Sequence, residues 1–198
     1  MKVVEINFNK PEKQGIDTAV RYLKAGKVIA YPTDTIYGLG ALISKPSAIK
    51  KIFKIKSREK KKPLLILVSS IAMLKKYCWL NKAQENYLKK LDRPTSVILK
   101  KRDVVPSELT GGADSIAVRL PNLPKSSFLI KMIRRINQPI ISTSLNISGE
   151  KNLISVENIA EYFEGEKPDL VVDAGPIENS PSQLIDIRNI SEIKVIRN

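Results

Sequence analysis

Amphipathic helix patterns and short apolar strand patterns alternate along the whole 198-residue chain, without a long linker or a repeat. Apolar residues three and four apart predict helices near residues 11–26, 46–53, 81–91, 129–136 and 156–163. Apolar runs predict strands at residues 1–6, 28–31, 64–68, 96–100, 116–119, 140–142, 170–173, 184–187 and 193–196. Such alternation is typical of α/β proteins, so we expect one α/β domain over residues 1–198 with a mixed sheet and flanking helices.

The composition excludes several classes of protein. The longest apolar run, residues 64–68, is too short to span a membrane, and residues 1–6 lack the apolar stretch of a signal peptide. The chain has no histidine, so a Ser-His or Cys-His catalytic pair is impossible. A single cysteine, Cys78, rules out an internal disulfide framework, argues against a His/Cys zinc site and fits a reducing cytosol. We expect a cytoplasmic protein in which Cys78 is a buried or half-buried hydrophobic side chain.

The net charge of +14 is concentrated in the first three quarters of the chain. Residues 149–198 carry 5 basic and 10 acidic side chains, whereas residues 50–62 hold eight basic side chains against one glutamate. A basic face suits an anion such as a phosphate, a nucleotide or RNA. A lysine bias from an AT-rich genome would also produce much of this excess, so charge alone does not identify the ligand.

Residues 31–40, YPTDTIYGLG, follow the predicted strand at 28–31 and predict a shaped polar loop at its end. Pro32 fixes φ, while Gly38 and Gly40 allow a left-handed backbone or a close approach of another group. Loops at strand ends are where α/β proteins usually bind ligands. The alternative is an ordinary connection from a strand to a helix.

Residues 56–64, KSREKKKPL, form a basic loop that leads into an apolar strand. The planar guanidinium of Arg58 matches a carboxylate or phosphate, and Lys56 and Lys62 add point charges. A solvated charge run is the alternative interpretation.

Three later features offer further polar groups. Arg119 ends a predicted strand, where it would pair with a carboxylate of the protein or of a ligand. Residues 142–149, STSLNISG, supply hydroxyls, an amide and open backbone N–H groups that suit phosphate or nucleobase oxygens, although such residues also cap helices. Ser182 begins the strand at 184–187, where it could reach a ligand or simply belong to a turn.

In their order and spacing, the blocks YPTDTIYGLG, KSR with KPL, AVRLP at residues 117–121 and STSLNISG resemble the YrdC-like family. These are the threonylcarbamoyl-AMP synthases, which begin synthesis of the t6A modification of tRNA. The resemblance covers residues 31–197 and implies a YrdC-like single domain of the short form, with a concave, basic ligand-binding face.

The resemblance implies that L-threonine and bicarbonate or CO2 give N-carboxy-threonine, whose carboxylate attacks the α-phosphate of ATP and releases pyrophosphate. Such a reaction depends on positioning and on stabilising phosphate charge, which a chain without histidine can do. Mg²⁺ is expected on the ATP phosphates, with no metal site built from protein side chains. The resemblance also implies a separate downstream transferase complex that modifies adenosine 37, and tRNA or dsRNA binding through the basic face is a further expectation.

The family's motifs place the predicted site residues. The expected ATP-binding residues are Lys56, Arg58, Lys62, Ser115, Ser144, Asn146 and Arg197, of which Lys56 and Arg58 are the expected catalytic pair. The expected threonine-binding residues are Thr35, Arg119, Thr143 and Ser182. Arg119 suits the amino acid's carboxylate as a bidentate partner. Asp34 gains no catalytic role from the resemblance, and we expect it to hold the shape of its loop.

Several positions depart from the family's pattern. Leu67 stands where some members carry a histidine near the threonine, and Gln183 replaces a second hydroxyl beside Ser182. The usual P-G-P-x-T block reads DRPTS at residues 92–96 and lacks its glycine, and Leu145 replaces an alanine. Two other functions stay open: a non-catalytic RNA-binding or translation-linked protein on the same fold, and a carbamoyl-transfer module like that of hydrogenase-maturation proteins.

Overall fold

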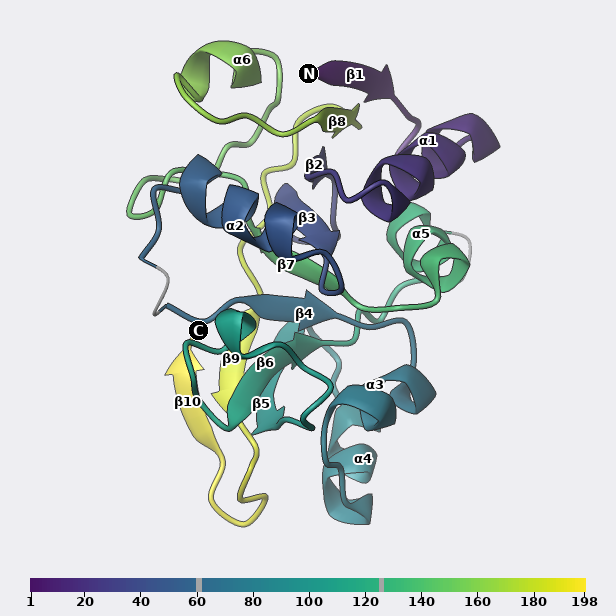
Figure 1. Ribbon diagram of the computed structural model, residues 1–198. Helices are drawn as coiled ribbons and strands as arrows, with labels where there is room; N and C mark the ends of the chain where they lie inside the picture. The colour runs from purple at the N-terminus through teal and green to yellow at the C-terminus, as the bar shows by residue number, and fades with distance from the viewer. Residues whose placement is uncertain (60–61, 125–126) are drawn as a thin grey trace.

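The computed structural model describes residues 1–59, 62–124 and 127–198. Ten strands of the described residues form one mixed sheet in the order β1-β8-β2-β3-β7-β4-β6-β5-β9-β10 (Figure 1). The strands are β1 (Lys2–Glu5), β2 (Ile29–Tyr31), β3 (Gly38–Leu42), β4 (Leu65–Leu67), β5 (Thr95–Lys100), β6 (Ser115–Arg119), β7 (Ile140–Ser144), β8 (Leu170–Asp173), β9 (Gln183–Asp186) and β10 (Lys194–Arg197). The predicted α/β class and mixed sheet are confirmed.

Six α-helices flank the sheet in the described part of the chain. They are α1 (Lys13–Lys24), α2 (Pro46–Ile55), α3 (Ile71–Tyr77), α4 (Lys82–Lys89), α5 (Phe128–Ile136) and α6 (Ile159–Tyr162). In Figure 1, α1 and α5 lie side by side next to the upper strands, α2 crosses in front of β3, and α3 and α4 lie beside the lower strands. No helix of the described residues is long and apolar enough to cross a membrane.

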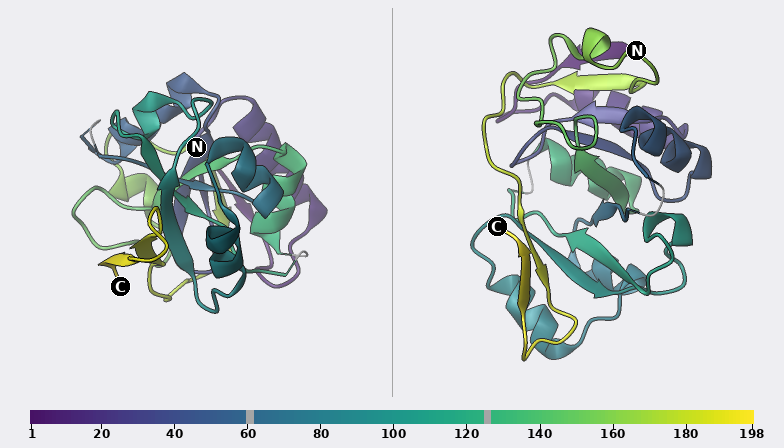
Figure 2. Two further views of the ribbon diagram at one scale, coloured as in Figure 1. Left: turned by 90° about the horizontal axis from the view of Figure 1, so that it is seen from below. Right: turned by 90° about the vertical axis from the view of Figure 1, so that its left-hand side faces the viewer.

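The sheet has two halves that meet at β7 and β4. These strands pair antiparallel, with Leu65 opposite Ser142, while β3 pairs with the other edge of β7. In the right-hand view of Figure 2, the segment after β8 runs down the side of the molecule from the upper half to β9 in the lower half. Residues 33–38, 58, 63–65, 142–144 and 182 come together where these halves meet.

Residues 38–40 belong to a strand, although the sequence predicted a loop there. Gly38 and Gly40 lie in β3, and neither has a positive φ. A Cβ atom on Gly40 would lie 2.6 Å from Tyr31 Cε1 and 2.8 Å from the Ile141 carbonyl oxygen. The expected close approach at Gly40 is thus present, because the Tyr31 ring packs where a side chain would otherwise be.

The helix predictions were right except at two places. The predicted capping pair of Asn81 and Gln84 forms a complete capping box at the start of α4. The helix predicted at residues 156–163 is shorter in the structure, where α6 covers only Ile159–Tyr162. Val156 and Phe163 are buried as the apolar pattern suggested, but both lie outside the helix. Helix α3 was not predicted; it is capped by Ser70, whose hydroxyl accepts a hydrogen bond of 3.0 Å from the Met73 N–H.

Replacing Gly40 by alanine should destabilise the fold. Because the new methyl group would overlap the Tyr31 ring and the Ile141 carbonyl, we expect Gly40→Ala to lower the free energy of unfolding by about 1–3 kcal/mol. Gly165→Ala is the control, since nothing lies within 4 Å of its Cβ position, and should change stability by no more than about 0.5 kcal/mol. Urea denaturation measures both, and equal effects would contradict the close approach.

Cys78 should be chemically inert in the native protein. The thiol is fully buried, as predicted, and burial raises its pKa to about 12, against an opposing effect of Arg102. An unfolded thiol ionises near pH 8.5, so at pH 8 an aromatic disulfide reagent should label Cys78 only after denaturation. Between about pH 9 and about pH 12 the unfolded state loses a proton that the native state keeps, so the free energy of unfolding should fall as pH rises. Rapid labelling of Cys78 in the native protein would contradict the expected inertness of the thiol.

Candidate functional site

A cavity of about 450 Å³ lies where the two halves of the sheet meet. Eight of the eleven predicted site residues line it. They are Thr35, Arg58, Ser115, Arg119, Thr143, Ser144, Ser182 and Arg197. The structure therefore brings together residues from six separate segments of the sequence, while Lys56, Lys62 and Asn146 lie outside the lining.

The loop between β2 and β3 is shaped by Thr33. Its Oγ1 accepts hydrogen bonds from the N–H groups of Thr35 at 3.1 Å and Ile36 at 3.2 Å, and donates to the Ile36 carbonyl at 2.7 Å. These bonds fold residues 33–36 into a tight polar turn whose Thr35 side chain lines the cavity. Thr33 thus shapes this loop, in addition to the role that we expected for Asp34.

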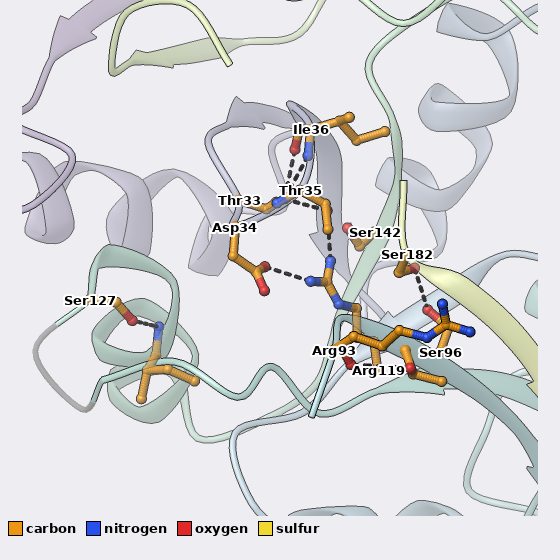
Figure 3. Close-up of polar contacts among 12 residues, drawn as sticks. Thr33, Asp34, Thr35, Ile36, Arg93, Ser96, Arg119, Ser127, Ser142 and Ser182 are labelled. Carbon is orange, nitrogen blue, oxygen red and sulfur yellow. Dashed lines mark hydrogen bonds and ion pairs between the residues drawn. The ribbon is translucent and has the colours of Figure 1, made fainter. Parts of the chain in front are cut away.

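The side chain of Asp34 instead contacts Arg119, which ends β6 (Figure 3). Asp34 Oδ1 lies 2.6 Å from Arg119 Nη2, and Arg119 Nη1 donates to Thr35 Oγ1 at 2.8 Å. Arg119 is only 5% exposed; burial lowers its pKa, and the Asp34 carboxylate opposes that shift. Nη1 is thus bonded to Thr35, whereas Arg119 Nε and Nη2 are buried without a hydrogen-bond partner among the described residues. The predicted bidentate pairing of Arg119 with a ligand carboxylate stays a prediction.

Lys56 lies behind the cavity lining. It is 1% exposed, and its Nζ donates to the Ser144 carbonyl at 2.6 Å, the Asn146 carbonyl at 2.8 Å and Asn146 Oδ1 at 2.8 Å. Burial, and then the nearby charge of Arg58, lower the pKa of Lys56 to about 7. The three oxygens match the three N–H groups of an ammonium and favour its charged form.

Asn146 is also occupied by protein groups. Its Oδ1 accepts from Ser144 Oγ at 2.6 Å as well as from Lys56, and its Nδ2 donates to the Glu150 carbonyl at 2.6 Å. Lys56 and Asn146 therefore hold the turn after β7 in place, while Ser144 at the end of that strand lines the cavity.

The basic loop reaches the cavity through Arg58. Ser57, with a left-handed φ of 47°, ends α2 and redirects the chain. Arg58 Nη2 then donates to the Pro63 carbonyl at 2.9 Å, which keeps the guanidinium at the cavity. Lys62 is exposed and forms a 3.4 Å ion pair with Glu59. The predicted loop also includes Lys60 and Lys61, which lie outside the described residues.

Two serines in the lining were not predicted as site residues. Ser96 Oγ lies 2.8 Å from Ser182 Oγ, and Ser142 Oγ accepts a 2.8 Å bond from the Tyr31 hydroxyl. Burial raises the pKa of Tyr31, which keeps that hydroxyl protonated as a donor. Ser142 could have been predicted, because it belongs to the hydroxyl-rich block at residues 142–149. For Ser96, the sequence offers no indication of a site apart from its position next to Thr95.

The chemistry of the lining suits a small anionic ligand. Arg58, Arg119 and Arg197 supply positive charge, and the hydroxyls of eight serines and threonines supply adaptable hydrogen bonds. Arg197 is fixed by a 2.9 Å bond from its Nη2 to the Ser182 carbonyl, which places β10 beside the cavity. Phosphate and carboxylate are the groups that such a set recognises.

Removing the buried ammonium of Lys56 should destabilise the protein more than removing Arg58. We expect Lys56→Met to lower the free energy of unfolding by about 3 kcal/mol, because three buried oxygens lose a charged donor. Arg58→Met, which removes a half-buried side chain bonded to the Pro63 carbonyl, should cost about 1 kcal/mol or less. Urea denaturation compares them, and a smaller loss for Lys56→Met would show that Lys56 does not hold the turn.

Comparison with known proteins agrees with this arrangement. Residues 21–198 match the model of the Sua5/YciO/YrdC family, which carries the description "Telomere recombination". The threonylcarbamoyl-AMP synthase of Pyrococcus abyssi is 35% identical over 166 residues, which are 83% of this chain and 48% of that protein. The putative threonylcarbamoyl-AMP synthase of Methanocaldococcus jannaschii is 31% identical over 198 residues, which are 98% of this chain and 90% of that protein.

The fold agrees as well. The crystal structure of P. abyssi Sua5 complexed with L-threonine superposes with a TM-score of 0.84 at 32% identity, covering 94% of this chain and 54% of that one. The chain thus spans about half to three fifths of the length of several relatives that it matches. Because the family model covers residues 21–198 and the M. jannaschii relative is 31% identical over nearly its whole length, this chain belongs to the Sua5/YciO/YrdC family.

Proposed function

We propose that this protein synthesises threonylcarbamoyl-AMP from L-threonine, bicarbonate or CO2, and ATP, and releases pyrophosphate. The observation that carries the proposal is one cavity that combines arginines with a cluster of hydroxyls, in a chain whose relatives are named threonylcarbamoyl-AMP synthases. A relative was solved with L-threonine bound. The product would be the activated intermediate for the t6A modification of adenosine 37 in tRNA.

The cavity can perform this reaction by positioning. The threonine amine and bicarbonate form the N-carboxy group with loss of water, and the new carboxylate oxygen attacks the α-phosphorus of ATP. The bond to the β-phosphate bridging oxygen breaks and pyrophosphate leaves. Holding the carbamate and the α-phosphate in line supplies most of the acceleration, so no side chain needs to act as a nucleophile.

We assign the reactants to the two polar parts of the lining. Arg58, Ser115, Ser144 and Arg197 offer charge and hydroxyls to the nucleotide phosphates, with Lys56 and Asn146 supporting Ser144 from behind. Thr35, Thr143 and Ser182 offer hydroxyls to L-threonine, near the positive charge of Arg119. A volume of about 450 Å³ falls within the usual range for small-molecule sites.

Mg²⁺ would reach the site on the nucleotide. The lining consists of hydroxyl, amide, guanidinium and apolar side chains, which fit phosphate oxygens better than they fit a bare divalent cation. Mg²⁺ on the β- and γ-phosphates would neutralise the charge of the leaving pyrophosphate. Bicarbonate as the carbon source, tRNA binding through the basic surface and transfer by a separate downstream complex belong to the same proposal.

The direct test is to incubate the purified protein with ATP, Mg²⁺, bicarbonate and L-threonine. We expect threonine-dependent release of pyrophosphate and a threonine-containing adenylate detectable by mass spectrometry. Omitting bicarbonate under CO2-free conditions should abolish both signals. If neither product forms with threonine, and tRNA nevertheless binds with a steep salt dependence, the protein is an RNA-binding member of the family instead.

Arg58 should contribute to catalysis far more than to stability. We expect Arg58→Met to lower kcat/KM for ATP by roughly a hundredfold, because the phosphates lose a positively charged donor at the cavity lining. Arg21→Met is the matched control, since Arg21 is an exposed residue of α1 away from the cavity. Steady-state pyrophosphate release measures both variants, and equal activity of the two would exclude Arg58 from the phosphate site.

A further inference from the structure

The contact between Asp34 and Arg119 lies beside the proposed threonine site and is not used by the reaction as described above. Asp34 comes from the β2–β3 loop in the upper half of the sheet, and Arg119 ends β6 in the lower half (Figure 3). Their side chains are 13% and 6% exposed, so the charge pair is shielded from solvent. Such a pair needs a structural or functional reason, because the desolvation of both charges opposes its formation.

The position of Arg119 is fixed from several sides. Its backbone pairs with Ser96 of β5 and Leu67 of β4, and its carbonyl accepts a 3.0 Å bond from the Val68 N–H. At the far end of the side chain, Nη2 lies 2.6 Å from Asp34 Oδ1, while Nη1 donates to Thr35 Oγ1 at 2.8 Å. The guanidinium therefore lies between two consecutive residues of the β2–β3 loop.

The hydrogen bonds around Thr33 determine what the Thr35 hydroxyl can do. The Thr33 hydroxyl donates its one proton to the Ile36 carbonyl at 2.7 Å, and its oxygen already accepts two backbone N–H groups. In the 3.0 Å contact between the two threonine hydroxyls, Thr33 can thus offer neither a proton nor a free lone pair. Since Thr35 Oγ1 accepts from Arg119, its own proton remains available to an oxygen in the cavity.

We propose that Asp34 and Arg119 are positioning residues that orient the Thr35 hydroxyl as a hydrogen-bond donor to an oxygen of the amino-acid substrate. The Asp34 carboxylate holds the guanidinium, and the guanidinium holds Thr35 Oγ1. Asp34 contacts neither substrate and accepts no proton. This inference rests on the proposed function, since it assigns the β2–β3 loop to threonine rather than to ATP.

The first test measures KM for both substrates in Asp34→Asn. We expect KM for L-threonine to rise about tenfold while KM for ATP stays within about twofold of the wild-type value. Asp17→Asn is the matched control, because Asp17 pairs with Arg135 between α1 and α5, away from the cavity, and should leave both constants unchanged. An unchanged or lower KM for L-threonine, or a parallel rise for both substrates, overturns the proposal.

A double-mutant cycle tests the path from Asp34 to Thr35. Thr35→Val alone should raise KM for L-threonine about tenfold, and Asp34→Asn combined with Thr35→Val should raise it about tenfold rather than about a hundredfold. Multiplicative effects would show that Asp34 acts independently of Thr35. If Asp34→Asn does not fold, Asp34→Glu replaces it, because the longer side chain keeps the charge but displaces the guanidinium; the same selective rise is expected.

Calorimetric titration of L-threonine separates this inference from the proposed function. If the wild-type protein binds L-threonine but makes no pyrophosphate, the proposed reaction is wrong, and Asp34 is judged by its effect on the dissociation constant. If the wild-type protein is active and Asp34→Asn matches it, only the role of Asp34 is wrong. If the wild-type protein neither binds L-threonine nor reacts with it, both fail.

Discussion

The buried ammonium of Lys56 is the interaction on which the phosphate side of the cavity depends. It lies at the end of α2 and is bonded to one oxygen of Ser144, which ends β7, and to two oxygens of Asn146 just beyond it. In the opposite direction, the Ser148 N–H donates to the Lys56 carbonyl at 2.9 Å. These bonds join two segments about ninety residues apart, and they fix the point from which the chain turns at Ser57 to place Arg58. A buried cation without these oxygens would be strongly unfavourable, so the helix end and the turn stabilise each other.

Arg119 follows the same principle on the other side of the cavity. It too is a nearly buried cation whose polar contacts are protein oxygens, in this case those of Asp34 and Thr35. The positively charged residues around the cavity therefore fall into two groups. Lys56 and Arg119 are buried and hold loops in place, whereas Arg58 and Arg197 are more exposed and line the cavity, where their charge is available to a ligand.

The sequence predicted most of the sheet because its apolar strands are flanked by clear breaks, such as Gly26 before β2 and Pro139 before β7. It did not reveal β3, because glycine has low strand propensity and only the packing of the Tyr31 ring explains Gly40. The short motifs did identify the residues that gather at the cavity. Spacing alone could not separate Ser144, which lines it, from Lys56 and Asn146 behind it, since that distinction depends on side-chain direction and burial. The pairing of Ser96 with Ser182 was equally hidden, because it depends on the parallel pairing of β5 with β9.

The proposed reaction does not require a histidine, and the chain contains none. A carbamate is already a nucleophile once formed, and pyrophosphate bound to Mg²⁺ is already a good leaving group, so the proposed reaction asks the protein mainly for alignment and charge. Alignment requires side chains that do not move, and the buried bonds of Lys56, Thr33 and Arg119 restrict the loops that carry Ser144 and Thr35. Hydroxyls oriented by such bonds present a defined donor or acceptor without any change in protonation. The cavity would therefore act through fixed geometry, and the residues on which it depends would include some that no substrate touches.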